Sequence, residues 1–62
     1  MKITIEFATD NAAFVDEFRD EVRRVLKRAV TFVLLRAIEG GETQHKLYDS
    51  NGNAVGNVTV VL

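Results

Sequence analysis

The side chains that could do chemistry in this sequence are few, and they lack the partners that a catalytic or metal site needs. His45 is the only histidine and there is no cysteine, so neither a zinc site nor a Ser-His-Asp arrangement is complete. Asp49, Asn51 and Asn53 alternate like the first ligands of an EF-hand loop, but the glycine is misplaced and the later glutamate is missing. We interpret His45 as a surface residue and the Asp49–Asn53 segment as a tight turn.

Four carboxylates lie close together in the sequence, at Asp16, Glu17, Asp20 and Glu21. Two of them could form an acid/base pair, but a chain of 62 residues cannot enclose a large pocket. Their positions suit the exposed first turns of a helix, where they favour the helix dipole, and Asp20 would pair with Arg24 at i,i+4. The glycines form no phosphate-binding motif. We therefore expect no enzymatic activity, no cofactor and no metal.

A cluster of basic residues follows these acids. Its members are Arg19, Arg23, Arg24, Lys27 and Arg28. Nucleic-acid binding through four of them is the alternative function that the sequence leaves open, with contacts at Arg23, Arg24, Lys27 and Arg28. Acids are interleaved with these residues, and Tyr48 is the only aromatic candidate for base stacking. We favour a solvated, salt-bridged face.

Length and composition indicate one small domain that spans residues 1–62. Eight basic and nine acidic residues give a net charge of −1, so there is no strong field to attract nucleic acid or a membrane surface. The first residues alternate instead of forming a signal peptide, and the longest apolar run, from Ala29 to Leu35, is too short to span a bilayer. We expect a cytoplasmic protein without membrane contact. Without cysteines or metal ligands, oligomerisation remains as a support for so small a core.

The apolar periodicity predicts the elements that must position these residues. Alternation over Lys2–Phe7 predicts a strand, and a helix should begin within residues 9–14 and end near Glu39, where Gly40 and Gly41 supply left-handed positions. Residues 45–48 and 57–62 should form two further strands, joined by a hairpin at Asn51-Gly52, where both residues tolerate positive φ. Gly56 indicates a bulge or a close backbone approach.

These elements predict an α+β fold of β-α-β-β type. One long amphipathic helix should pack on a three-stranded antiparallel sheet of order 1-3-2, because the helix carries the chain back across the sheet. At about 100° per residue, an apolar stripe gathers on one side of the helix and should lie on the sheet. The stripe comprises Val15, Phe18, Val22, Val25, Leu26, Ala29, Val33 and Ala37, with Val30 and Phe32 at its edges.

A second apolar cluster at the end of the helix does not fit a monomer. Leu34, Leu35 and Ile38 point away from the stripe. Either the hairpin or the 40–44 loop encloses them, or they form an interface, and we favour the interface because exposed clusters of large apolar residues commonly mark one. With the neighbouring Thr31, these residues are the predicted interface, and a symmetric homodimer is the commonest arrangement for such a patch.

Several segments resemble a group of very small phage and prophage proteins. These proteins share a TDNAAF-type start, which stands here at Thr9–Phe14, an EVxRxL-like helix core at Glu21–Leu26, and a DxNGNxVG hairpin at Asp49–Gly56. This sequence departs from that pattern in its longer and more apolar helix end, from Val30 to Leu35. The resemblance implies a phage-related protein in a bacterial cell. It leads us to expect a homodimeric, non-enzymatic protein-binding module that modulates or inhibits a host protein.

Overall fold

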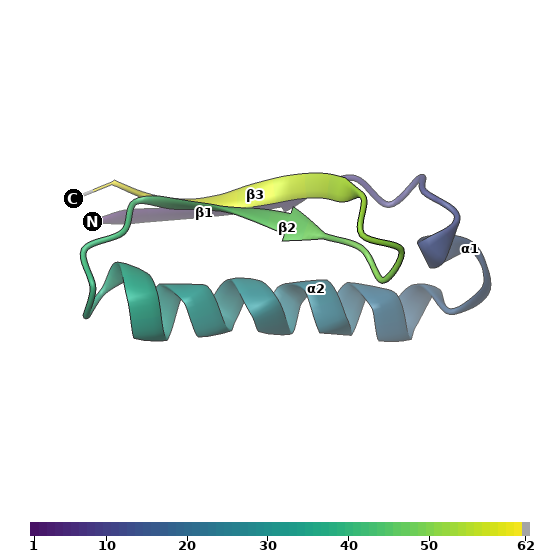
Figure 1. The fold of residues 1–62 in the computed structure, drawn as a ribbon, viewed down its shortest axis with the longest axis horizontal. Helices are drawn as coiled ribbons and strands as arrows, with labels where there is room; N and C mark the ends of the chain where they lie inside the picture. Colours follow the sequence, from purple (N-terminus) through teal and green to yellow (C-terminus); the bar gives the residue numbers. More distant parts are fainter. Residues whose placement is uncertain (62) are drawn as a thin grey trace.

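The computed structural model describes residues 1–61 and has two layers, a three-stranded sheet and a long helix that lies along one face of it (Figure 1). Along the chain the elements are β1 (Lys2–Phe7), α1 (Ala13–Asp16), α2 (Phe18–Phe32), the π-helical turn η1 (Val33–Ala37), β2 (Gln44–Tyr48) and β3 (Ala54–Val61). The strand order is β1-β3-β2, and both pairs are antiparallel. The predicted fold class and strand order are confirmed; the predicted strand position of Leu62 lies outside the described residues.

The helical segment is interrupted near its start, which the sequence did not predict. Glu17 has φ −127° and ψ 58°, and it separates the single turn α1 from α2. Phe14 of α1 is buried, and its ring centroid lies 6.3 Å from that of Phe7 on β1. Figure 1 shows α1 beyond the end of the sheet. The interruption therefore lets Phe14 fold back and close this end of the core.

The other end of the helix widens into a π turn before it stops. Ile38 N donates to Val33 O at 3.1 Å, an i→i+5 bond. Gly41 then adopts φ 75°, and its N–H donates to the Ala37 carbonyl, so it ends the helix as expected. Gly40 does not have a positive φ. A glycine is needed at this position for a steric reason instead, since a Cβ there would lie 2.7 Å from the carbonyl oxygen of Arg36.

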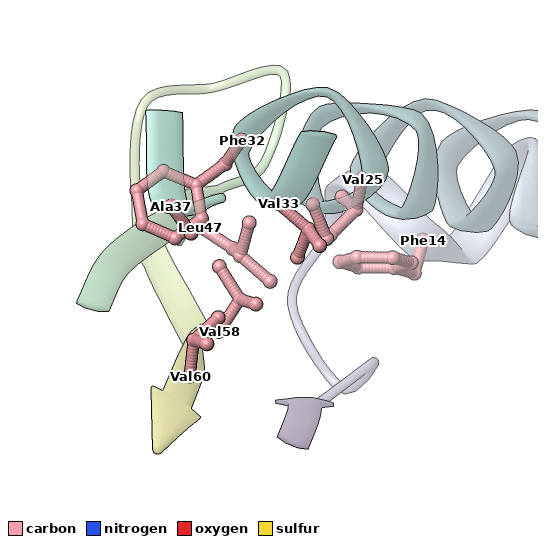
Figure 2. Close-up of a cluster of buried hydrophobic side chains, with 9 residues drawn as sticks. Phe14, Val25, Phe32, Val33, Ala37, Leu47, Val58 and Val60 are labelled. Atoms are coloured by element: carbon pink, nitrogen blue, oxygen red, sulfur yellow. The ribbon is translucent and has the colours of Figure 1, made fainter. Parts of the chain in front are cut away.

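The core lies between α2, η1 and the two strands β2 and β3 (Figure 2). Its buried residues are Phe14, Val25, Ala29, Phe32, Val33, Ala37, Leu47, Val58 and Val60. The predicted stripe is right for the four members at 25, 29, 33 and 37. It is wrong for Val15, Phe18 and Leu26, which are exposed, and Phe32 is fully in the core instead of at an edge. Val15 lies on α1, before the break at Glu17, Phe18 is the first residue of α2, and Leu26 lies on a flank of α2 rather than on the face that meets the sheet.

The hairpin between β2 and β3 forms where Asn51-Gly52 predicted it. Gly52 has φ 84° and its N–H donates to the Asp49 carbonyl, while Asp49 N–H donates to the Asn53 carbonyl. Asn51 does not adopt a positive φ. The turn therefore uses one left-handed residue, where the sequence suggested two.

Gly56 marks both features that its position in the strand predicted. Leu47 pairs with Gly56 and Tyr48 with Ala54, so Val55 is an extra residue that bulges from β3. On the other side Gly56 faces Phe7, and a Cβ at this position would overlap the Glu6 carbonyl oxygen and the Phe7 backbone. Only glycine lets β1 approach β3 this closely.

Replacing Gly56 with alanine should therefore destabilise the protein more than the same change in the turn. We expect Gly56→Ala to cost at least about 2 kcal/mol of unfolding free energy, because backbone atoms must shift to accept the methyl group. Gly52→Ala meets no atom within 4 Å and should cost only about 1 kcal/mol, from its positive φ. Urea unfolding of both variants measures this ranking, and equal costs would contradict it.

Candidate functional site

The two flanks of α2 differ in character and face different strands. Arg24 Nη2 donates to the Tyr48 carbonyl of β2 at 3.1 Å, and the Phe32 ring stacks on His45 of β2 at 5.0 Å. This polar flank therefore faces β2. Leu26 follows Arg24 by two residues, about 200° around the helix, and lies on the opposite flank, toward β1.

The flank toward β1 is apolar and exposed along its length. Its residues recur every fourth position, and we call them the β1-side flank: Phe18, Val22, Leu26 and Val30. With the stems of Arg19, Arg23 and Lys27 they line an open groove of about 660 Å³. Three of the four are exposed, and only Val22 packs partly against the core. An uncovered row of this length is the candidate binding surface.

The inner face of β1 continues this apolar surface onto the sheet. Ile3, Ile5 and Phe7 alternate onto the face that carries Val58 and Val60, which are their neighbours on β3. Val58 and Val60 are buried, whereas Ile3 is 44% exposed and Ile5 and Phe7 are half-buried. The helix therefore covers β2 and β3 and leaves much of β1 bare.

The predicted interface residues at the end of the helix are all on the surface. Leu34, Leu35 and Ile38 are 56%, 60% and 52% exposed, and Thr31 is exposed beside them. Neither the hairpin nor the 40–44 loop encloses them, so the interpretation as a covered cluster is wrong for the described residues. Leu34 and Ile38 extend the four-residue spacing of the β1-side flank past Val30, whereas Leu35 lies on the other side, with Thr31.

The basic residues proposed for nucleic acid are only partly free. Arg23 pairs with Asp20 at 2.9 Å, and Arg24 pairs with Glu21 at 2.9 Å. The predicted Asp20–Arg24 pair is thus wrong, because both acids pair at i,i+3. Lys27 and Arg28 are exposed. The two ion pairs reduce the positive charge that this face could offer to phosphates.

Two buried carboxylates hold the hairpin, one from the helix and one from within the turn, and the sequence did not indicate their burial. Glu21 is 6% exposed, and its carboxylate accepts hydrogen bonds from Arg24 and from the backbone N–H of Ser50 at 2.6 Å. Asp49 is 3% exposed and accepts from Asn51 N, Asn53 N and Asn11 Nδ2. Every buried side-chain polar atom among the described residues has a partner. The network is structural and leaves no unsatisfied group for a ligand.

These hydrogen bonds lower the pKa of both carboxyls. The Arg24 guanidinium holds the pKa of Glu21 below its ordinary value, and the N–H of Ser50 adds to this effect. The hydrogen bond from the backbone N–H of Asn53 lowers the pKa of Asp49, with further donation from Asn11 and Asn51. In both cases burial acts in the opposite direction and is outweighed. Both groups therefore stabilise the fold as anions.

His45 differs from its interpretation as a plain surface residue. It is half-buried and stacks on Phe32, and the Arg36 guanidinium lies 5.8 Å from the other ring, that of Phe32. Residues 1–61 contain no group of three or more His, Cys, Asp or Glu placed to hold a metal ion. The ring of His45 therefore belongs to the packing between β2 and the helix.

Comparisons with protein-family models, curated proteins and solved structures give no match for this chain. Within the described part of the chain, no helix has the length and apolar character to cross a membrane.

The buried carboxylates predict a loss of stability in acid. Because their pKa values are lower in the folded protein, the unfolded chain binds more protons, so unfolding free energy should fall as the pH drops below about 4. Glu21→Gln should lower stability at neutral pH and flatten this dependence. Asp16→Asn is the matched control, since Asp16 is exposed and outside the network. Urea unfolding between about pH 2 and about pH 7, a range that spans the ordinary carboxyl pKa values, measures the effect. Parallel plots of unfolding free energy against pH for Glu21→Gln and the wild type would contradict it.

Proposed function

We propose that this chain is a small, non-enzymatic protein-binding module that acts as a homodimer and modulates a host or phage protein. The observation that carries the proposal is the continuous exposed apolar surface on one helix of so small a domain. It comprises Phe18, Leu26, Val30, Leu34 and Ile38, and Leu35 is exposed on the other side of the helix end. Large apolar side chains in a row are costly to leave in water, and in soluble proteins such surfaces commonly serve protein contacts.

The chemistry of the remaining surface supports binding over catalysis. The buried acids Glu21 and Asp49 are fully engaged in holding the hairpin, and His45 is stacked on Phe32. The groove on the β1-side flank is lined by aliphatic and aromatic side chains and by the stems of three cations. Such a lining offers hydrophobic contact with a rim of charge, which is the usual composition of a protein interface.

The proposed cellular role follows from the resemblance to small phage and prophage proteins. The segments that carry it are the helix entry at Thr9–Phe14 and the hairpin at Asp49–Gly56. Both are structural segments in this fold: Asn11 donates to Asp49 at 3.0 Å and joins one to the other. The helix end, where this sequence departs from the similar proteins, is the part that exposes Leu34, Leu35 and Ile38. We therefore place the binding specificity of this chain at that end.

Solution mass measured by light scattering over a range of concentrations tests the dimer. We expect twice the monomer mass of 6.9 kDa, and Leu34→Glu should raise the dissociation constant by about tenfold or more, since it places a charge in an apolar contact. Leu34 is exposed, so the monomer should keep its helical circular dichroism. Val15→Glu is the control, because Val15 is an exposed apolar residue on α1, outside the surface. A monomer at every concentration would overturn the homodimer.

A further inference from the structure

We propose that two copies of this chain join through the free edge of β1, so that their sheets form one continuous six-stranded sheet with both helices on the same face. This inference rests on the proposed homodimer and specifies its geometry. Within residues 1–61, β1 pairs with β3 alone, so its other edge is open. An open edge beside an uncovered apolar face is a template for a further strand.

The backbone groups at this edge are available for pairing. Ala8 N donates to Val55 O, and Val60 N donates to Thr43 O, just before β2. Both bonds indicate the same alternation of backbone groups along β1, in which the N–H and C=O groups of residues 2, 4 and 6 point toward β3. The N–H and C=O groups of Ile3, Ile5 and Phe7 therefore point to the open edge. At the opposite edge of the sheet, by contrast, the Tyr48 carbonyl already accepts a hydrogen bond from Arg24.

The alternation limits how a second β1 can pair with the first. In an antiparallel pair, Ile3, Ile5 and Phe7 must lie opposite residues that also point to the edge. The two-fold axis can then pass through Ile3, Thr4 or Ile5. With the axis at Thr4, Ile3 of each copy lies opposite Ile5 of the other, and the two Thr4 residues form a non-hydrogen-bonded pair.

The charges of β1 select this register and point to a second copy as the occupant. With the axis at Thr4, Lys2 lies opposite Glu6 of the other copy, and this pair occurs twice by symmetry. Lys2, Thr4 and Glu6 share the outer face of the sheet and are exposed. An axis at Ile3 or Ile5 leaves Lys2 and Glu6 without an opposite charge directly across the strand pair. Cross-strand pairs of opposite charge stabilise a sheet, and like charges destabilise it.

The same register brings the exposed apolar residues of both helices toward the axis. Phe32 stacks on His45, which pairs with Val58, and Val58 pairs with Ile5. Along the direction of the strands, Phe32 of the helix therefore lies at the same level as Ile5. A two-fold axis through Thr4 passes beside this turn, where Val30 and Leu34 are exposed on the β1 side. Val30 and Leu34 of the two copies then face each other across the paired β1 strands, above Ile3 and Ile5, while Phe18 and Val22 lie farther along the helix, away from the axis.

This geometry leaves one side of the helix end outside the dimer. Leu35 and Thr31 lie on the flank toward β2, away from the axis. In this arrangement Leu34 belongs to the contact between copies, and Leu35 is available to the modulated protein.

A cysteine at Thr4 tests the register directly, because the chain has no cysteine of its own. In a non-hydrogen-bonded antiparallel pair the Cα atoms lie about 4.5 Å apart, within the range of a disulfide. Thr4→Cys should therefore give an intermolecular disulfide dimer on mild oxidation, detected by non-reducing electrophoresis. Asn57→Cys is the control: it is also exposed on the outer face, but on the central strand, and should stay unlinked.

Charge reversal tests the Lys2–Glu6 pairs. Lys2→Glu should raise the dissociation constant by about tenfold or more, since it creates two like-charge pairs, and adding Glu6→Lys in the same chain should restore dimerisation. Lys46→Glu changes the same charge on β2 and should leave the dimer intact. A wild-type dimer in which Thr4→Cys stays unlinked and Lys2→Glu has no effect would overturn the edge pairing but keep the homodimer. A wild type that is monomeric at all concentrations would overturn both.

Discussion

The position of α2 over β2 and β3 is the constraint on which the other features of this molecule depend. A single α-helix with its side chains is about 10–12 Å wide, and strands lie about 4.8 Å apart, so one helix cannot cover three strands completely. Two polar contacts fix the helix on the β2 side, since Glu21 accepts a hydrogen bond from the Ser50 N–H in the hairpin and Arg24, paired with Glu21, donates to the Tyr48 carbonyl of β2. The bare face of β1 and the exposed β1-side flank follow from this position.

Burying the carboxylates of this network costs free energy of desolvation. The fold tolerates this cost because every carboxylate in the network is hydrogen-bonded. Burying a carboxylate is unfavourable unless its oxygens are hydrogen-bonded, and the carboxylates of Glu21 and Asp49 both are. Together they join three segments that are distant in sequence: the loop at Asn11, the start of α2 and the hairpin turn. In a core made mainly of valine and alanine, these directional bonds fix the relative position of helix and sheet more closely than apolar packing alone.

Local sequence patterns were sufficient for most of the fold. The alternation of Ile3, Ile5 and Phe7 predicted β1, and Asn51-Gly52 predicted the hairpin, because each depends on residues close in sequence. The burial of Glu21 could not be predicted, since its partner at Ser50 lies 29 residues away. Likewise, the helical periodicity placed Phe18 and Leu26 in the same stripe as Val25, and their exposure depends on where the helix lies over the sheet. The predicted cluster at Leu34, Leu35 and Ile38 is exposed, as an interface requires, but its extension along Val30 and Leu26 depended on knowing which strands the helix covers.

The π turn η1 carries a consequence for how such a chain can change. A π turn holds one more residue than the α-helical turn it replaces, so it accommodates an insertion without a break in the helix. Val33 and Ala37 of this turn are both in the core, while Leu34, Leu35 and Ile38 stay outside. Single-residue insertions and deletions within Val33–Ala37 would rotate the helix tip relative to the rest of the molecule and leave the contacts of Val25 and Ala29 in place. The tip can thus acquire a new set of outward side chains by a change of length, provided that apolar residues take the core positions of Val33 and Ala37.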